Sequence, residues 1–370
     1  MANHSKSVLP KNLFTIITLA LSVGILLFFL FTTDGIVELG HIVRRIQLQW
    51  LLWIVVAILS GWLLEGYVLH LFCKHLYPQW EFGRSFTVAM VGLLYSALTP
   101  FSAGEPMEVY TMNKMGMDTG AAGSIIAVKS LVHHAVTLVY SLVLVALELH
   151  YFQTSVSNFS FLVLLGLLSN GIFITLVIMF MISEKTTDRI LNAVINLLHK
   201  LRLCRKPEKT YQKVHDQLSV FHGSSKLIGK SYWLYFWAVL LTVIQITFAS
   251  IISYFVYRSF NLRGESVVTM IAADTFVTMV AAFVPLPGSS GGAEGGFALF
   301  FGRTFGSAII PAILLWRIAT YYVNILFGCI IVYFGNRRYP KIDLPGSDDT
   351  DKNLDSIERL GEVITHEKGK

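Results

Sequence analysis

The sequence predicts an all-α integral membrane protein that crosses the bilayer several times. Of its 370 residues, 54% are hydrophobic and only 14% are charged, and the mean hydropathy is +0.61. A soluble domain carries about 25% charged residues. Several nearly uncharged runs exceed the ~18 residues that a helix needs to cross the hydrocarbon core. A glycine- and proline-rich break, VPLPGSSGGAEGGF (284–297), interrupts this apolar sequence.

We expect about six full transmembrane helices within a membrane domain of residues 1–335. They are 12–32, 48–73, 121–149, 159–181, 231–257 and 309–334. Two further apolar stretches, 85–113 and 267–302, each run into a Pro/Gly break and then continue as a shorter segment. Lipid cannot satisfy the backbone groups that a break frees, so we interpret both stretches as re-entrant hairpins inside the protein.

Positive charge predicts the orientation. The segment 182–230 holds ten Lys and Arg against four acids, whereas the loop 150–158 holds no Lys or Arg. Because cytoplasmic loops carry the excess of Lys and Arg, we expect 182–230 and both termini inside a bacterial-type plasma membrane. The first hairpin then enters from the cytoplasm and the second from outside. This predicts an inverted repeat of residues 10–181 and 231–335.

Two polar segments accompany the membrane domain. The stretch 186–202, TTDRILNAVINLLHKLR, lies in the basic linker 182–230 and has one apolar helical face. It fits a helix on the anionic membrane surface, and a solvated connector docked on the bundle fits equally well. The tail 336–370 is polar, and we expect it to be disordered in the cytoplasm.

The two breaks resemble each other in sequence. Each places proline first, then small residues, then a glutamate: TPFSAGE at 99–105 and PLPGSSGGAE at 285–294. Exposed amides and half-helix termini at such breaks form polar pockets near the bilayer midplane, so we place the substrate site there. The loop positions are Pro100, Gly104, Pro285, Pro287, Gly288, Gly291 and Gly292.

Ionisable side chains at membrane depth are costly and are therefore candidates for substrate binding. The candidates are Glu65, Glu105, Lys129, Asp274, Glu294 and Arg317. Glu105 and Glu294 follow the breaks. They are expected to contact a lipid headgroup, a proton or a cation, or else to cap the helix that follows.

The basic candidates suggest phosphate. A guanidinium binds phosphate with two parallel hydrogen bonds, so Arg317 is either a lipid-phosphate contact or a partner of Glu294. Lys129 is a second candidate phosphate contact. Asp274 is a candidate partner for either base, and Glu65 requires a partner of its own.

Three residues near these candidates are weaker candidates for substrate binding. Glu108 lies nearer the end of its hairpin, which is compatible with a solvated position. His133 and His134 are interpreted as packed and hydrogen-bonded side chains rather than as ligands.

The sequence also argues against several kinds of site and classes of protein. Cys73, Cys204 and Cys329 form no metal-binding spacing, so we expect neither a disulfide framework nor a metal site. P-loop and HExxH motifs are absent, and the polar segments are shorter than a catalytic domain of about 100 residues. We expect no cofactor and no nucleic-acid partner. A homo-oligomer is left open.

The first break, TPFSAGEPMEVYTMNKMG, leads into a helix with Lys129. The second, AAFVPLPGSSGGAEGGFALFFGRTFG, leads into a helix with Arg317. Together they resemble the transmembrane region of the lysylphosphatidylglycerol synthase/flippase family, related to the bacterial multiple peptide resistance factor. The resemblance spans residues 10–335. Where many members have a basic residue shortly after the first Gly-Glu, this chain has Glu108.

The resemblance implies a membrane domain that moves lysylated phosphatidylglycerol or another lipid between leaflets. It places Glu294, Arg317 and the 285–292 loop at the site, together with Gly104 and Glu105. Full-length members add a cytoplasmic synthase domain, for which we find no counterpart in this sequence. A separate synthase protein is then the expected source of lysylated lipid.

The sequence therefore predicts a flippase-like lipid translocator that binds a phospholipid headgroup. Arg317 and Lys129 would neutralise phosphate, and Glu105 and Glu294 would meet an amine or a proton. Two alternatives stay open: a membrane-embedded enzyme of the phosphatidylglycerol lysyltransferase type, and a secondary transporter of a small ion or solute. A lateral opening to lipid favours the translocator, whereas a closed water-filled vestibule favours the transporter.

Overall fold

The computed structural model describes residues 46–100, 103–156, 159–183, 187–189, 192–193, 207–342 and 344. The principal elements of these residues are α3 (Leu48–Leu76), α4 (Phe82–Leu98), α5 (Glu105–Lys114), α6 (Thr119–Ser155), α7 (Phe159–Ile182), α9 (Pro207–Gly229), α10 (Tyr232–Ser259), α11 (Val267–Ala281), η2 (Pro287–Ser289), α12 (Gly292–Phe305), η3 (Gly306–Ala308), α13 (Ile309–Arg317), η4 (Ile318–Tyr322) and α14 (Val323–Arg338). The expected span 12–32 and most of the stretch 186–202 lie outside the described residues.

Helices long and apolar enough to cross a bilayer confirm the predicted polytopic, all-α membrane protein. The described residues contain five such stretches: Leu48–Leu76, Thr119–Thr154, Phe159–Met181, Tyr232–Ser259 and the composite Pro287–Gly335. They cover the five expected spans that follow the first. Large apolar side chains such as Leu52, Leu164 and Phe236 are more than half exposed on them, as expected of helices that face lipid.

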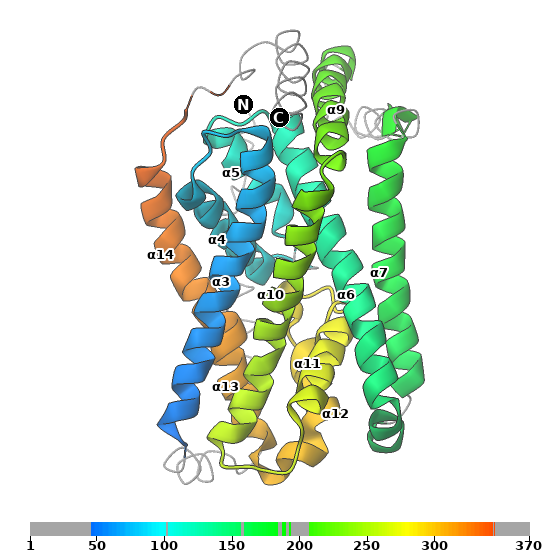
Figure 1. Cartoon of the computed structure of the whole chain (residues 1–370), viewed down its shortest axis with the longest axis vertical. Coiled ribbons are helices and arrows are strands. Elements are labelled where there is room, and N and C mark those ends of the chain that lie inside the picture. Colours follow the sequence, from blue (N-terminus) through cyan, green and yellow to red (C-terminus); the bar gives the residue numbers. More distant parts are fainter. Residues whose placement is uncertain are drawn as a thin grey trace, which may run out of the picture.

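Two helical hairpins lie between these long helices. In hairpin 1 (82–114), α4 packs against α5 after a break, and in hairpin 2 (267–305), α11 packs against α12. Figure 1 shows hairpin 1 in the half of the molecule that also carries α9, and hairpin 2 in the opposite half. We term the end with α9 the linker end, and the end with residues 260–266 the loop end.

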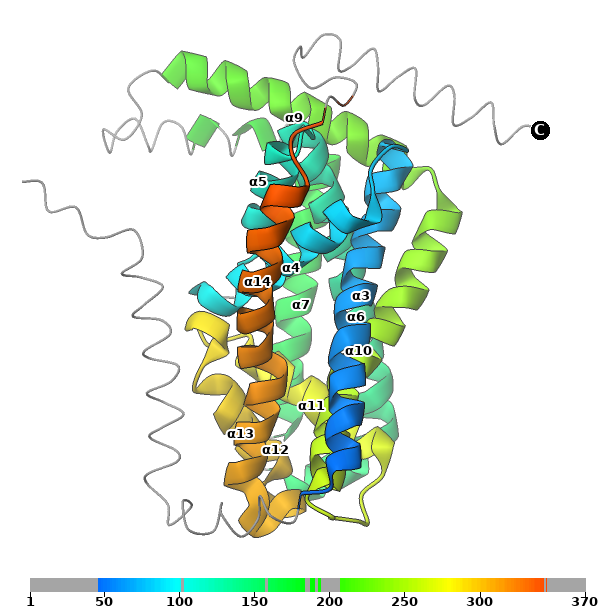
Figure 2. The same ribbon diagram turned by 90° about the vertical axis from the view of Figure 1, so that its left-hand side faces the viewer.

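The two halves of the chain repeat one order of elements in opposite directions. The first half runs α3, hairpin 1, α6, and the second runs α10, hairpin 2, α13–α14. In Figures 1 and 2, α3 runs toward the linker end and α10 away from it, while α6 runs away from it and α13–α14 toward it. α3 and α10 pack against each other. The order and directions agree with the expected inverted repeat.

The tips of the hairpins meet near the middle of the long axis (Figure 2). There η2 of hairpin 2 packs against α4 of hairpin 1. The hydroxyl of Tyr321, in the π-helical turn η4, donates to the carbonyl of Ala97 near the end of α4 at 3.1 Å. The two breaks and the helix after hairpin 2 therefore form one junction.

Part of the basic linker is a docked helix. α9 lies across the linker end (Figure 2) and packs against α6. A Cβ at Gly120 would lie 2.1 Å from the backbone oxygen of Gln217, so only glycine permits this approach. The Gly120 N–H donates to Gln217 Oε1 at 2.9 Å and to Asp118 Oδ1 at 2.8 Å, and Asp118 caps α6.

The folded chain continues beyond the expected boundary at residue 335. α14 runs to Arg338, and the following segment packs over the base of hairpin 1. Arg84 Nη1 donates to the carbonyl of Pro340 at 2.8 Å, and the N–H of Ile342 donates to Met115 O at 3.1 Å. Leu344 is 4% exposed. Residues 339–342 therefore contact both arms of the hairpin, through Arg84 near the start of α4 and Met115 after α5.

Cysteine labelling tests the orientation. Arg263 and Gln79 are exposed at the loop end and the linker end respectively. In a variant with Cys204 and Cys329 replaced by serine, Arg263→Cys should react with a membrane-impermeant maleimide on intact cells. Gln79→Cys should react only after permeabilisation, because the basic linker end is expected in the cytoplasm. The reverse pattern would contradict the proposed orientation.

Candidate functional site

A buried ion pair fastens hairpin 2 to the helix that follows it. Arg317 Nε donates to Glu294 Oε1 at 2.7 Å, and their side chains are only 5% and 2% exposed. The other Glu294 oxygen accepts the N–H of Gly291 at 2.6 Å, which caps α12. Arg317 Nη1 donates to the carbonyl of Gly288 at 3.2 Å. Glu294 therefore both caps its helix and neutralises the arginine.

Glycines shape the tip of hairpin 2. Gly288 has φ +58°, and a Cβ there would lie 2.1 Å from the ring of Tyr321. Gly291 has φ +85°, in the region that disfavours other residues. A Cβ at Gly292 would lie 2.2 Å from a methyl group of Val284. These glycines let the backbone turn tightly, so that the carbonyl of Gly288 reaches Arg317.

The remaining loop positions of the prediction lie around the same two breaks. Pro287 is buried and begins η2, whereas Pro285 is exposed just before it. Pro100 follows the last turn of α4. A Cβ at Gly104 would lie 2.1 Å from the backbone oxygen of Gly92, so α5 begins directly against α4.

Hairpin 1 carries a second buried cluster, which joins four helices. Lys129 Nζ lies 2.9 and 2.8 Å from the two oxygens of Glu108 and 2.9 Å from Glu65 Oε1. Gln245 Nε2 donates to the other oxygen of Glu65. The Lys129, Glu65 and Glu108 side chains are 10%, 16% and 4% exposed. Gly92 makes room, because a Cβ there would lie 2.0 Å from Glu108 Oε1.

The solvated position that the sequence allows for Glu108 is not found. Glu108 is 3% exposed, because α5 folds back against α4 and α6 and turns this side chain into the bundle. Glu105 is half-buried and accepts a hydrogen bond from Ser130 Oγ at 2.5 Å. Of the two glutamates on α5, the structure pairs Glu108 with Lys129 and leaves Glu105 without an ion pair among the described residues.

The two clusters follow one rule. In each hairpin, the second arm carries a glutamate that pairs with a base in the next helix. Glu108 and Lys129 are separated by 21 residues, and Glu294 and Arg317 by 23. By position in the repeat, Glu108 is therefore the counterpart of Glu294, although the break sequences alone suggest Glu105.

Asp274 stands apart from both bases. Its Oδ1 accepts the indole N–H of Trp316 at 3.0 Å, and the residue is 5% exposed. The expected pairing with Arg317 or Lys129 is not found, since the ion pairs of the described residues do not include Asp274. Trp316 is also adjacent to Arg317 and lies under its guanidinium, 5.5 Å from the ring centre.

Sequence reasoning missed three members of the site: Gln245, Trp316 and Tyr321. They are neutral, and their local sequence gives no indication of a role. Only the packing of the helices brings them to the site. The histidine interpretation agrees with the structure at His134, whose Nδ1 lies 2.9 Å from Asn170 Oδ1 and links α6 to α7.

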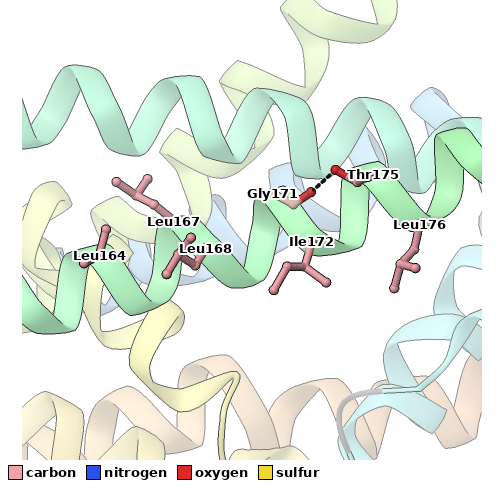
Figure 3. A pocket seen from close by; sticks show the side chains of 7 residues that line it. All are labelled: Leu164, Leu167, Leu168, Gly171, Ile172, Thr175 and Leu176. Carbon is pink, nitrogen blue, oxygen red and sulfur yellow. Dashed lines mark hydrogen bonds between the residues drawn. The ribbon is translucent and has the colours of Figure 1, made fainter.

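An apolar groove lies on the side of the bundle formed by α7. Its volume is about 450 Å³, and it is lined by Leu164, Leu167, Leu168, Gly171, Ile172, Thr175 and Leu176. Figure 3 shows Ile172 and Leu176 pointing from one side of α7 into the open space. A Cβ at Gly171 would meet no atom within 4 Å. The groove is therefore an open lateral surface rather than an enclosed chamber.

The chain belongs to the family described as the lysylphosphatidylglycerol synthase TM region, whose family model matches residues 15–328. This confirms the predicted family and places the chain among membrane proteins connected with lipid. A "UPF0104 membrane protein" from Archaeoglobus fulgidus is 25% identical over 312 residues, covering 77% of this chain and 87% of that protein. No solved structure matches the chain.

The pair of Glu294 and Arg317 predicts a large stability effect. Glu294→Gln leaves a buried guanidinium without its counter-charge, which should lower the free energy of unfolding by about 3–5 kcal/mol. The double variant Glu294→Gln/Arg317→Gln removes both charges and should recover much of the loss. Thermal unfolding of detergent-purified protein measures both. A double variant no more stable than Glu294→Gln would contradict a dominant role for the charge pair.

Proposed function

We propose that the protein moves a phospholipid between the leaflets of a membrane. The observation that carries the proposal is the junction at mid-length, where two hairpin tips of opposite orientation meet beside the buried guanidinium of Arg317. Broken helices that meet inside a repeat form substrate sites in transporters. In this proposal the hairpins are re-entrant, and the linker end faces the cytoplasm of a plasma membrane.

Arg317 supplies the anion-binding group. Its Nε and Nη1 are occupied by Glu294 and Gly288, but its buried Nη2 has no hydrogen-bond partner among the described residues. A buried donor without a partner is costly. A lipid phosphate entering the junction would satisfy it and would compete with Glu294 for the guanidinium fork. The structure then corresponds to a closed state, with the arginine held by its own carboxylate.

The α7 groove supports a lipid rather than a water-soluble substrate. Six of its seven lining residues are leucine, isoleucine or glycine, and it lies on an exposed helix. An acyl chain can remain in such a lateral groove while the headgroup enters the junction. A secondary transporter of a small solute would instead need a polar vestibule.

Lysyl-phosphatidylglycerol is the lipid that the family description favours. Its headgroup carries a phosphate and amines, so Glu105 is a suitable amine contact because it is half-buried and hydrogen-bonded to Ser130. The lysylated lipid would come from a separate synthase. Without a P-loop in the sequence, translocation is facilitated or ion-coupled.

A vesicle assay tests the proposal. Purified protein is reconstituted into phosphatidylglycerol vesicles that contain a fluorescent lysyl-phosphatidylglycerol, and a membrane-impermeant quencher reports movement between leaflets. Arg317→Lys keeps the charge near Glu294 but loses the planar fork, so the rate should fall about tenfold or more. The matched control is Arg303→Lys, because Arg303 is exposed at the loop end and donates to the carbonyl of Thr154 at 3.2 Å.

Three outcomes decide between the alternatives. Fast quenching with wild type and Arg303→Lys, and slow quenching with monodisperse Arg317→Lys, supports the translocator. Quenching no faster than in protein-free vesicles contradicts it. Formation of lysylated lipid from lysyl-tRNA and phosphatidylglycerol by this chain alone would favour the transferase.

A further inference from the structure

The cluster at hairpin 1 is not electrically balanced. Lys129 provides one positive charge, whereas Glu65 and Glu108 provide two negative charges within 2.9 Å of it. The pair of Arg317 and Glu294 in the other half is balanced one to one. Net charge in a site away from water is costly, so a buried cluster with one excess carboxylate favours uptake of one positive charge.

The hydrogen bonds indicate which carboxylate accepts that charge. Glu65 uses its two oxygens for two different donors, Lys129 and Gln245. Both oxygens of Glu108 face the same ammonium, that of Lys129. The Glu108 side chain is also less exposed than that of Glu65, at 4% against 16%. A carboxylate with more donors is better held in its charged form. Glu108 is therefore the group that accepts a proton.

We propose that Glu65, Lys129 and Glu108 form a proton-binding triad, and that proton binding unlocks hairpin 1, meaning that it breaks the ion pair between α5 and α6. The proton binds a Glu108 carboxylate oxygen, which leaves Lys129 paired with Glu65 in a balanced one-to-one pair. The second arm of hairpin 1 then loses its ionic tie to α6. This inference rests on the proposed lipid translocation only for its consequence, which is that translocation accelerates as the pH falls.

Other groups face the triad from the elements around it. Cys73 on α3, Glu105 on α5 and His133 on α6 interact electrostatically with its members. α10 contributes the neutral Gln245, and α4 contributes Gly92, which has no side chain. His133 is the rival proton acceptor, because histidine changes charge between about pH 5 and 8.

Infrared spectroscopy tests proton binding without any transport. Spectra of the purified full-length protein are compared between about pH 9 and about pH 5, a range that brackets the titration of buried carboxyls. We expect wild type to gain the high-frequency C=O band of a carboxylic acid shielded from water. Because Asp274 is a second buried carboxyl without a base among the described residues, the spectra are compared in an Asp274→Asn background, in which Glu108→Gln should lose this band. Glu265→Gln, a control at a half-buried acid bonded to Tyr151 at the loop end, should keep it.

Both triad variants should fold, because each leaves Lys129 with one carboxylate. Glu108→Gln and Glu65→Gln should therefore unfold close to wild type, unlike Glu294→Gln. An unchanged infrared band in Glu108→Gln overturns the proton site, whatever the lipid assay shows. If His133 took up the proton instead, wild type would gain no carboxylic-acid band at low pH, because imidazolium has no C=O group, and that result overturns the assignment.

The vesicle assay then tests the coupling with opposite expectations for the two variants. The wild-type rate should rise as the pH falls, approaching about tenfold per pH unit. Glu108→Gln should be fast at every pH, because hairpin 1 is permanently unlocked. Glu65→Gln should be slow at every pH, because Lys129 keeps Glu108 charged. A pH-independent wild-type rate overturns the coupling, while absence of any lipid movement refutes the translocator and leaves the infrared result to decide the proton site.

Discussion

Neutralisation of charge away from water is the constraint on which this structure depends. Each hairpin is broken where helical hydrogen bonds end, and each carries a buried glutamate in its second arm. Neither carboxylate can remain alone inside the bundle, so each meets a base from the next helix: Lys129 at 2.8 Å from Glu108, and Arg317 at 2.7 Å from Glu294. These pairs tie the second arm of each hairpin to the helix that follows it.

The two halves are alike in layout but unlike in chemistry. Arginine presents a planar fork that can hold a carboxylate and still offer another donor, as Arg317 does with Nη2, which has no partner in the part of the chain that the structure describes. Lysine presents a compact ammonium that can be shared, as Lys129 is shared between two carboxylates. We infer that the two halves of the repeat have different roles: the second half recognises an anion, and the first half takes up a proton.

Much of the fold was predictable because it follows from apolar length and from breaks. Long uncharged runs give the spans from 48–73 onward, and the Pro/Gly sequences locate both hairpin tips. The family was predictable because both breaks, with the Lys129 and Arg317 helices that follow them, resemble its members. Arg317 and Glu294 were predictable as partners because each is a rare charge in apolar sequence.

The pairings of the acids were harder to predict. Glu108 looks like a surface residue because EPMEVYTMNK is polar, and only the return of α5 against α4 and α6 buries it. Asp274 looks like a partner for a base, yet the packing of α13 brings it the indole of Trp316. Both errors arise from three-dimensional neighbours that have no signal in the local sequence.

The π-helical turn at Ile318–Tyr322 has a consequence for the helix beyond it. A π turn inserts one extra residue, and one residue corresponds to about 100° of rotation about a helix axis. That rotation sets the facing of α14, on which Gly328 and Gly335 receive Leu94 and Thr87 of α4 at distances that admit no larger side chain without displacement. Relaxation of this turn to regular α-helix would swing both glycines away from hairpin 1. The π turn therefore links the segment at Arg317 to the contact between α14 and hairpin 1.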